Sequence, residues 1–308
     1  MRRLMDIDLR LLRVFVAVAE GGGYTAAQST LNISSSTISL HMSDLEKRIG
    51  FRLCERGRHG FSLTERGKVA YDEIRRILGS LDDFTGRMAE LRKRLAGKLH
   101  LGMVDCLSTH PNFPLVTVIR RFNELDNDVH IELAVAPRAD IERAVLGGHL
   151  HAGIVPFIRT INGLDFRPVL RERHQLFCGV GHPLFGLGES SVPAHEITEH
   201  DFVLRAYTEQ FDLSRFPRAR ASATVFSMEA MLILLLSGGY LGLLPDHVAR
   251  EWVDRGKLSR VPSDDFEYDS RHMLITSTSA KSPAAINVFL SILDETIAGT
   301  GSAQTMTG

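Results

Sequence analysis

The chain is poor in cysteine and has no long apolar run, and each scarcity excludes a class of protein. Its three cysteines, Cys54, Cys106 and Cys178, are an odd number without metal-ligand spacing, which argues against a disulfide framework and is typical of reduced thiols. The apolar run at 231–236 is far shorter than the roughly 20 residues of a membrane helix. The N-terminal residues lack the apolar core of a secretory signal, so we expect a cytoplasmic protein.

An excess of charge of one sign is also missing from the chain as a whole, whose net charge is −1. The charge nevertheless separates along the sequence. Residues 1–100 contain 18 Lys and Arg against 12 Asp and Glu, whereas the remaining residues contain 18 against 25. A basic N-terminal part is suited to binding a polyanion, because binding releases counterions. We expect the acidic remainder not to contact the polyanion. The length allows two or three domains.

Residues 24–49 carry the start signals and apolar spacing of two short helices joined by a turn. Thr25 is the expected N-cap of the first helix, with Gln28 completing a capping box, and the turn follows at Asn32-Ile33. Ser34 is the expected N-cap of the second helix, whose buried stripe ends at Gly50. The opposite face carries small hydrogen-bonding groups that suit a DNA groove: Ser35, Ser36, Thr37, Ser39, Leu40, His41 and Ser43. The alternative is two ordinary solvated helices.

The flanks of this helix pair favour DNA binding. An amphipathic helix precedes it, with Leu9, Leu12 and Phe15 on one side. Two β-prone runs follow, on either side of residues 57–60, and predict a hairpin with a basic tip. The side chains that would contact phosphate are Arg52, Arg56, Arg58 and His59. Taken alone, this pattern also fits a plain surface hairpin.

Residues 7–66 resemble the winged helix-turn-helix of LysR-type transcriptional regulators. The resemblance runs through Leu9-Arg10, Leu12, residues 15–20, Thr25-Ala26-Ala27, Leu31, Ser34, Ser39, Leu45-Glu46, Gly50, Leu53, Glu55-Arg56, Leu63-Thr64 and Gly67. Ser35-Ser36 and Leu40-His41 depart from the residues common in that family. The resemblance implies a mainly α DNA-binding domain at residues 1–64, which reads promoter DNA and has RNA polymerase as a further candidate partner.

Residues 65–96 are predicted to form one long helix with an apolar heptad seam. The seam consists of Ile74, Ile77, Leu81, Phe84, Met88, Leu91 and Leu95. A narrow apolar stripe on a highly charged helix stays exposed to solvent unless a partner covers it. We therefore expect a homodimer or a dimer of dimers, as the resemblance also implies; the alternative is packing onto this chain's own C-terminal domain.

The remainder predicts an α/β effector-binding domain at residues 97–300 with two Rossmann-like lobes. Alternating strands and helices from residue 99 to 155 predict a βαβαβ unit with a parallel sheet, and residues 175–244 predict a second. The expected lobes are 97–165 with 268–300, and 166–267. A final helix is expected from Ser282-Pro283, with a disordered tail at 301–308.

The LysR resemblance continues here more loosely, through residues 147–150, 181–184, 237–245 and 256–258. It implies the effector-binding domain of that family, which is similar in fold to periplasmic solute-binding proteins. His151 stands where the family pattern has Asp, so that position receives no role from the resemblance.

Effector residues are expected in loops at the carboxyl ends of the parallel strands. The candidates are Asp105, Cys106, Leu107, Ser108, Thr109 and His110 in the first lobe, and Arg205, Tyr207, Phe226, Ser227 and Met228 in the second. The helix entered through Pro114, together with Arg205, would suit an organic acid. Asp105 could instead hold an amino or hydroxyl group.

Three other functions remain to be weighed. An enzyme could use Ser108 with His110, or His149 and His151 as metal ligands, but neither pair has a third partner in the sequence. A transport-type solute-binding protein would not explain the N-terminal helices. A thiol switch could use Cys106 with Cys178. We expect a regulator that is not an enzyme and has no metal or cofactor beyond its effector.

Overall fold

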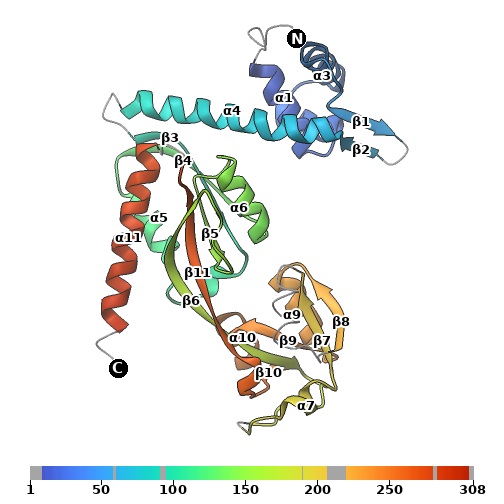
Figure 1. Ribbon diagram of the computed structural model, residues 1–308, viewed down its shortest axis with the longest axis vertical. Helices are drawn as coiled ribbons and strands as arrows, with labels where there is room; N and C mark the ends of the chain where they lie inside the picture. Colours follow the sequence, from blue (N-terminus) through green and yellow to red (C-terminus); the bar gives the residue numbers. More distant parts are fainter. Residues whose placement is uncertain are drawn as a thin grey trace. The chain divides into compact units, whose positions relative to one another are not determined.

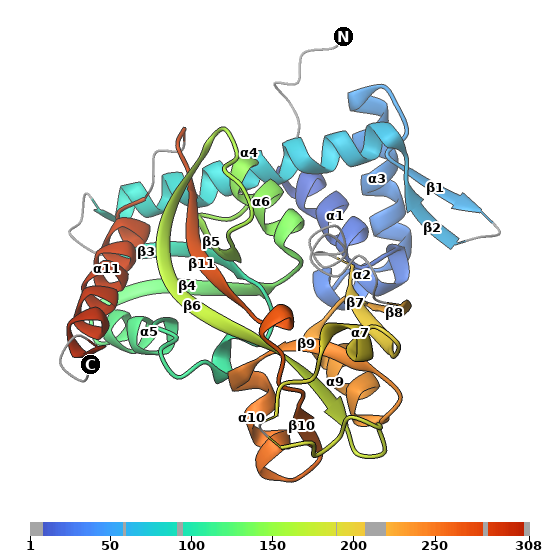
Figure 2. The same ribbon diagram turned by 60° about the horizontal axis from the view of Figure 1, so that its bottom comes forward.

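The computed structural model describes residues 9–57, 60–90, 95–188, 190–206, 220–279 and 283–304. The chain divides into two compact units, Met1–Met88 with Gly147–His149, and Ala89–Leu146 with Leu150–Gly308. Figures 1 and 2 label the main elements of both units. Within the described residues, no helix combines the length and apolar character needed to cross a bilayer.

The first unit is a helix-turn-helix followed by a hairpin and a long helix. Its elements are α1 (Leu9–Glu20), α2 (Tyr24–Leu31), α3 (Ser35–Ile49), β1 (Cys54–Gly57), β2 (Gly60–Leu63) and α4 (Glu65–Glu90). Phe15, Ala27, Ile38 and Leu45 are fully buried in its core. Strands β1 and β2 pair antiparallel, so the predicted hairpin, called the wing below, is present.

Three predictions about element ends are wrong. Helix α2 begins at Tyr24 and its N-cap is Gly23, with φ of +148° and no side-chain bond. Thr25 therefore lies in the first turn, because the glycine turn sets the cap. Leu95 does not extend α4 but opens strand β3 (Leu95–Met103). Residues 301–304 are not a disordered tail, since α11 runs from Ala284 to Gln304.

The first lobe of the second unit is a sheet covered by helices on both faces. Strands β4 (Asn127–Val135), β3 and β5 (Ala152–Pro156) are parallel, as predicted, and β11 (Tyr268–Ser277) pairs antiparallel with β5. Helices α5 (Leu115–Asn123) and α11 cover one face and α6 (Arg138–Leu146) the other (Figure 1). Phe122 on α5 meets Phe289 on α11 with 5.5 Å between ring centroids.

The second lobe is mixed rather than parallel. Strand β6 (Leu164–Gly179) pairs antiparallel with β9 (Leu241–Pro245) and β10 (Leu258–Arg260), whereas β7 (Asp201–Arg205) is parallel to β8 (Arg220–Val225) and β9. Helices α9 (Met228–Leu236) and α10 (Asp246–Asp254) pack on one face, and the short α7 (Ala194–Ile197) on the other.

Two long strands join the lobes. Strand β6 pairs with β11 from Leu164 to His174 and with β9 from His174 to Cys178. Figure 2 shows β6 and β11 passing together from the sheet of the first lobe into the second. The described strands apart from the wing therefore form one continuous sheet, in the order β4-β3-β5-β11-β6-β9-β7-β8, with β10 paired to β6 beside this path.

Candidate functional sites

The exposed face of α3 is the first candidate site, and its N-terminus is fixed by Ser34. The Ser34 hydroxyl accepts from the backbone N–H of Thr37 at 3.2 Å and lies 2.8 Å from the hydroxyls of Ser36 and Thr37. Ser34 is therefore the N-cap that the sequence predicted. Ser36, Ser39 and Leu40 are exposed and Ser35, Thr37 and His41 are half-buried, so this face presents small polar groups on a helix with a rigid start.

Glu46 joins α3 to the wing. Its Oε1 accepts from the backbone N–H groups of Leu53, at 2.7 Å, and Cys54, at 3.3 Å. Tyr24 of α2 meets Phe61 of the wing edge-on, with 6.3 Å between ring centroids. The wing is thus held beside α3 by contacts that no sequence pattern had indicated.

The predicted phosphate-contacting residues are only partly described. Arg52 is exposed just before β1, and Arg56 lies in β1 opposite Phe61. Arg58 and His59 lie outside the described residues. Thr25 is exposed on α2. Direct contact of these residues with DNA stays a prediction.

The predicted seam on α4 divides into two parts. Ile74 is 5% exposed and packs into the core of the first unit. Ile77, Phe84 and Met88 are 48%, 52% and 42% exposed, and Leu81 is half-buried. Leu91 lies outside the described residues. An apolar stripe therefore remains on the later part of α4.

The second candidate site is a cavity of about 390 Å³ between the two lobes of the second unit. Six predicted effector residues line it: Asp105, Cys106, Arg205, Phe226, Ser227 and Met228. Leu107 is fully buried in the core instead, and Tyr207 lies outside the described residues. Ser108, Thr109 and His110 do not line the cavity, because the short helix at Leu107–Thr109 directs them elsewhere.

The helix termini at the cavity also differ from the prediction. Helix α5, entered through Pro114, packs into the core and does not reach the cavity. The starts of α6 and α9 reach it instead. The Asp105 carboxylate accepts from the N–H of Met228 at 2.7 Å, and Ser227 caps α9 by accepting from Ala230. Since the chain's own carboxylate occupies the α9 terminus, this helix has less capacity for an external anion.

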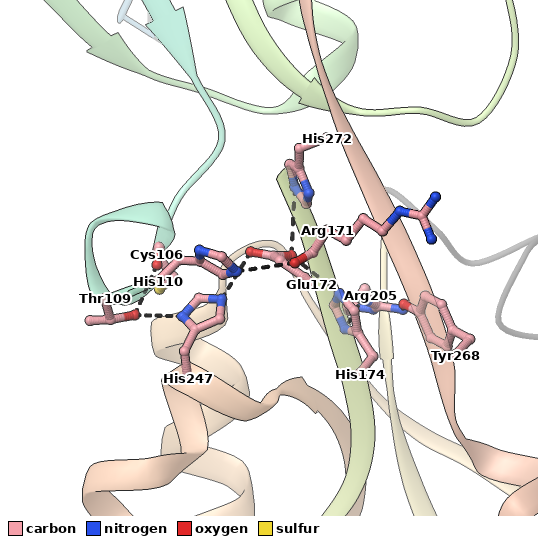
Figure 3. Close-up of polar contacts among 10 residues, drawn as sticks. All are labelled: Cys106, Thr109, His110, Arg171, Glu172, His174, Arg205, His247, Tyr268 and His272. Atoms are coloured by element: carbon pink, nitrogen blue, oxygen red, sulfur yellow. Dashed lines mark hydrogen bonds and ion pairs between the residues drawn. The ribbon is translucent and has the colours of Figure 1, made fainter. Parts of the chain in front are cut away.

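A buried glutamate organises one wall of the cavity. Glu172 on β6 lies 3.0 Å from His247 Nε2, 3.3 Å from His174 Nε2 and 3.6 Å from His272 Nε2 (Figure 3). Burial by itself would raise the pKa of Glu172, but hydrogen bonds from His174 and His247 and the nearby His272 hold it well below its usual range. Glu172 is therefore an ionised carboxylate.

Two of the histidines around Glu172, His174 and His272, are neutral near pH 7. Burial lowers the pKa of His174 to about 4, despite the adjacent glutamate, and burial also lowers the pKa of His272. Their Nε2 atoms face a carboxylate rather than a shared point, and the described residues contain no group of three or more His, Cys, Asp or Glu arranged to hold a metal ion.

Arg205 is more deeply buried than predicted. It is 2% exposed, and its guanidinium donates to His174 Nδ1 at 3.3 Å and to the hydroxyl of Tyr268. Tyr268 in turn stacks on His174 with 4.7 Å between ring centroids. Arg205 is therefore committed to holding this wall, as Figure 3 shows.

Another arginine at the cavity has free hydrogen-bonding capacity. Arg138, at the start of α6, pairs with Glu142 at 2.6 Å through one terminal nitrogen. Its Nε is buried and has no partner among the described residues. The His272 Nδ1 is buried and unpartnered in the same sense. Sequence reasoning missed four residues of this cavity: Arg138, Glu172, His174 and His272. The only signal in the sequence that could have indicated them was the alternation of Glu172 and His174 along one strand.

The two cysteines of the proposed thiol switch have high pKa values. Burial raises the pKa of Cys106 to about 12, helped by Asp105, and burial raises the pKa of Cys178 to about 12. Cys178 is fully buried in a core cluster of which Cys106 is no part. Reactive thiols are usually accessible and have a low pKa, so neither cysteine has the character of a redox sensor.

Sequence profiles of known families match both units. The profile described as the LysR substrate binding domain matches residues 92–298. The profile described as bacterial regulatory helix-turn-helix protein, lysR family, matches residues 9–68. The two ranges contain the cavity and the exposed face of α3, respectively.

Known proteins are similar along most of the chain. The HTH-type transcriptional activator BauR of Pseudomonas aeruginosa is 35% identical over 289 residues, which are 94% of this chain and 95% of the relative. The crystal structure of CbnR, described as a LysR family transcriptional regulator, has a TM-score of 0.67 at 21% identity and covers 94% of this chain and 99% of its own. Full-length CbnR complexed with its target DNA has a TM-score of 0.65 at 20% identity, covering 94% of this chain and 100% of the other.

Proposed function

We propose that this chain, which belongs to the LysR family of transcriptional regulators, binds promoter DNA as a homo-oligomer under the control of a small organic acid. The members of this family are DNA-binding proteins with an effector-binding domain and are not enzymes. RNA polymerase would be the partner through which it acts. The observation that carries the proposal is the cavity between the lobes, whose polar wall includes an arginine Nε with no partner among the described residues.

The exposed face of α3 is the proposed DNA-reading surface. Its small side chains admit close approach to base edges, and Ser36 and His41 lie on a helix whose first turn is capped. The exposed Arg52 is placed to contact phosphate, and Arg56, Arg58 and His59 are proposed for the same role. Base contacts should determine sequence preference, whereas phosphate contacts strengthen binding to every sequence.

The DNA-binding proposal is tested with fragments selected from the source genome by the protein itself. We expect Ser36→Ala and His41→Ala to narrow the difference in affinity between a selected site and its scrambled version. Arg52→Ala should weaken binding to both and reduce the salt slope by about 0.9. Fluorescence anisotropy across a salt series measures both effects. Equal losses on the two DNAs for Ser36→Ala and His41→Ala would remove α3 as the reading helix.

The effector proposal rests on unsatisfied donors in the cavity. An N–H without an acceptor in a buried site costs free energy, which a carboxylate would recover as a charge-assisted hydrogen bond. Arg138 can offer its Nε–H while keeping its ion pair with Glu142, whereas Arg205 is occupied by His174 and Tyr268. We therefore propose Arg138 as the anchor for the acid, in place of Arg205.

This anchor is tested by calorimetry with an acid identified in a thermal-shift screen. Arg138→Ala should weaken binding by about 1.5–3 kcal/mol, the range for a hydrogen bond to a charged group. Arg143→Ala is the matched control, since Arg143 lies on the same helix but its side chain is 77% exposed and does not line the cavity. If both variants bind the acid as tightly as the parent, the acid is held elsewhere.

A further inference from the structure

We propose that the effector carries a hydrogen-bond donor, either a hydroxyl or an ammonium group, in addition to its carboxylate, and that the Nδ1 atom of His272 accepts from this donor. The inference rests on the proposed function of the cavity as a site for an acid. It makes the effector a hydroxy acid or an amino acid rather than a simple carboxylic acid.

The first support is the position of His272. Its side chain lines the cavity and is 3% exposed. The pairing of β11 with β6 shifts register between His272 and Met273, so that His272 lies opposite Leu170 and Met273 opposite Pro168. Such a bulge re-aims side chains locally. The ring lies with Nε2 3.6 Å from the Glu172 carboxylate.

The second support is the tautomer that Glu172 imposes. An ionised carboxylate can only accept, and a neutral imidazole has one N–H. Placing the proton on Nε2 gives the favourable pairing with Glu172, and it leaves Nδ1 as a bare acceptor. The opposite tautomer would place a lone pair against a carboxylate. Since burial lowers the pKa of His272, the neutral form is the relevant one near pH 7.

His174 supplies an internal comparison. Its Nε2 also faces Glu172, and its Nδ1 accepts from Arg205, a group that can only donate. The two histidines therefore share one tautomer and one partner carboxylate. They differ in that Nδ1 of His174 has its donor, whereas Nδ1 of His272 has none among the described residues. The missing donor is the group that we assign to the ligand.

The other groups around His272 do not supply a donor. Besides Glu172 on β6, the titratable groups that act on it are His110, before α5, and His247 on α10. His247 directs its nitrogens to Glu172 and Thr109, and Nε2 of His110 lies 3.0 Å from the Arg171 carbonyl. A ligand that enters the cavity without a donor would displace water and leave Nδ1 unsatisfied.

The ligand must therefore match two opposite demands. Arg138 Nε is a donor that needs an acceptor, and His272 Nδ1 is an acceptor that needs a donor. Both residues line the same cavity, and both atoms are buried without a hydrogen-bond partner among the described residues. A carboxylate alone satisfies the first demand, and an alcohol or amine alone satisfies the second. A molecule with both groups satisfies both.

The experiment uses the full chain and the acid identified in the thermal-shift screen, together with matched acids of the same chain length. Each acid is supplied in three forms: unsubstituted, hydroxyl-substituted and amino-substituted at each position. Calorimetry should show that at least one substituted form binds ten-fold or more tighter than the unsubstituted acid of the same length. His272→Leu removes the acceptor and should erase this difference, whereas His272→Asn retains an acceptor at the δ position and should preserve part of it.

The outcomes separate the inference from the proposed function. If unsubstituted and substituted acids bind equally well, the donor requirement is wrong but the acid site stands. If a preference for the donor persists in His272→Leu but is lost in Asp105→Asn, Asp105 receives the donor and the assignment to His272 is wrong. If no acid of either kind binds, the proposed acid site itself fails. Should His272→Leu not fold, as judged by circular dichroism, the comparison of acids on the parent and on His272→Asn decides.

Discussion

Glu172 shows how a single residue can set the chemistry of a whole cavity wall. It is 5% exposed and holds the proton positions of the histidines that surround it. Replacing it would leave these imidazoles without a common acceptor, and their tautomers would no longer be fixed. The stability of the second unit should consequently depend on pH through this cluster.

We expect the second unit to lose stability as the pH falls below 6.5. Burial lowers the pKa of His174 from 6.5 to about 4, so between these values the unfolded chain takes up a proton that the folded chain does not. Stability is therefore complete above pH 6.5 and is lost towards pH 4. Glu172, whose pKa is held below its ordinary 4.5 despite burial, adds a further loss below pH 4.5, because the unfolded chain is protonated first.

Thermal melting at pH 7 and pH 5 measures this effect. His174→Gln should reduce the difference between the two melting temperatures. It should not abolish the difference, since burial and the neighbouring His200 lower the pKa of His182 to about 4 as well. A melting temperature that is equal or higher at pH 5 contradicts the prediction.

Individual residues also show the limits of sequence reasoning. Ser34 was predictable as a cap because the signal is local: a serine hydroxyl at the start of a helix can accept from the backbone N–H three residues later. Thr25 carried the same signal, but the N-cap of α2 is Gly23, whose φ of +148° only glycine adopts easily. Arg138 and His272 gave no local signal, since their importance comes from the partners they lack in the folded chain.

At the scale of elements, α4 shows that periodicity cannot say what covers an apolar stripe. The spacing of the seven seam residues is uniform, but Ile74 is covered by this chain's own core while Ile77, Phe84 and Met88 are exposed. Leu95 continued the spacing and is nevertheless the first residue of β3. Strand pairing with Asn127 outweighed the helical pattern there.

The exposed part of α4 is the proposed contact between subunits. Phe84→Glu combined with Met88→Glu should separate the subunits, because an unpaired charge buried in an apolar contact costs several kcal/mol. Both positions are exposed in the single chain, so its own fold should tolerate the change. Light scattering measures the mass, with Arg87→Glu as an exposed control on the same helix. An unchanged mass for the double variant would show that subunits meet elsewhere.

At the scale of the whole molecule, the fold was predictable where contacts are local. The βαβαβ run of the first lobe was recognisable because each strand pairs with a neighbour across one helix. Strand β11 and the first half of β6 were missed, since they pair across about a hundred residues and carry charged runs such as Arg171, Glu172 and Arg173. The cavity lies against these two strands, so the missed elements are those that supply His174 and His272.

We expect the two units to unfold in separate transitions, because each has its own apolar core. An acid that binds the cavity should raise only the transition of the second unit, as expected for a ligand specific to one folded part. Gly67→Ala identifies the other transition, since a Cβ there would lie 1.9 Å from the Leu53 carbonyl oxygen. Gly299→Ala, which meets nothing within 4 Å, is the control. Differential scanning calorimetry that shows one transition moved by both ligand and Gly67→Ala would contradict independent units.

The interrupted first lobe has a consequence for synthesis on the ribosome. Its strands β3, β4 and β5 emerge early, but the strand and helix that complete its core, β11 and α11, are among the last elements translated. The second lobe, inserted between them, can fold first, and the DNA-binding unit can fold earlier still. A nascent chain would therefore have a reading helix well before it has a sensor. Chaperones that shield the unfinished sheet, rather than the helix-turn-helix, would then govern how much regulated protein a cell obtains.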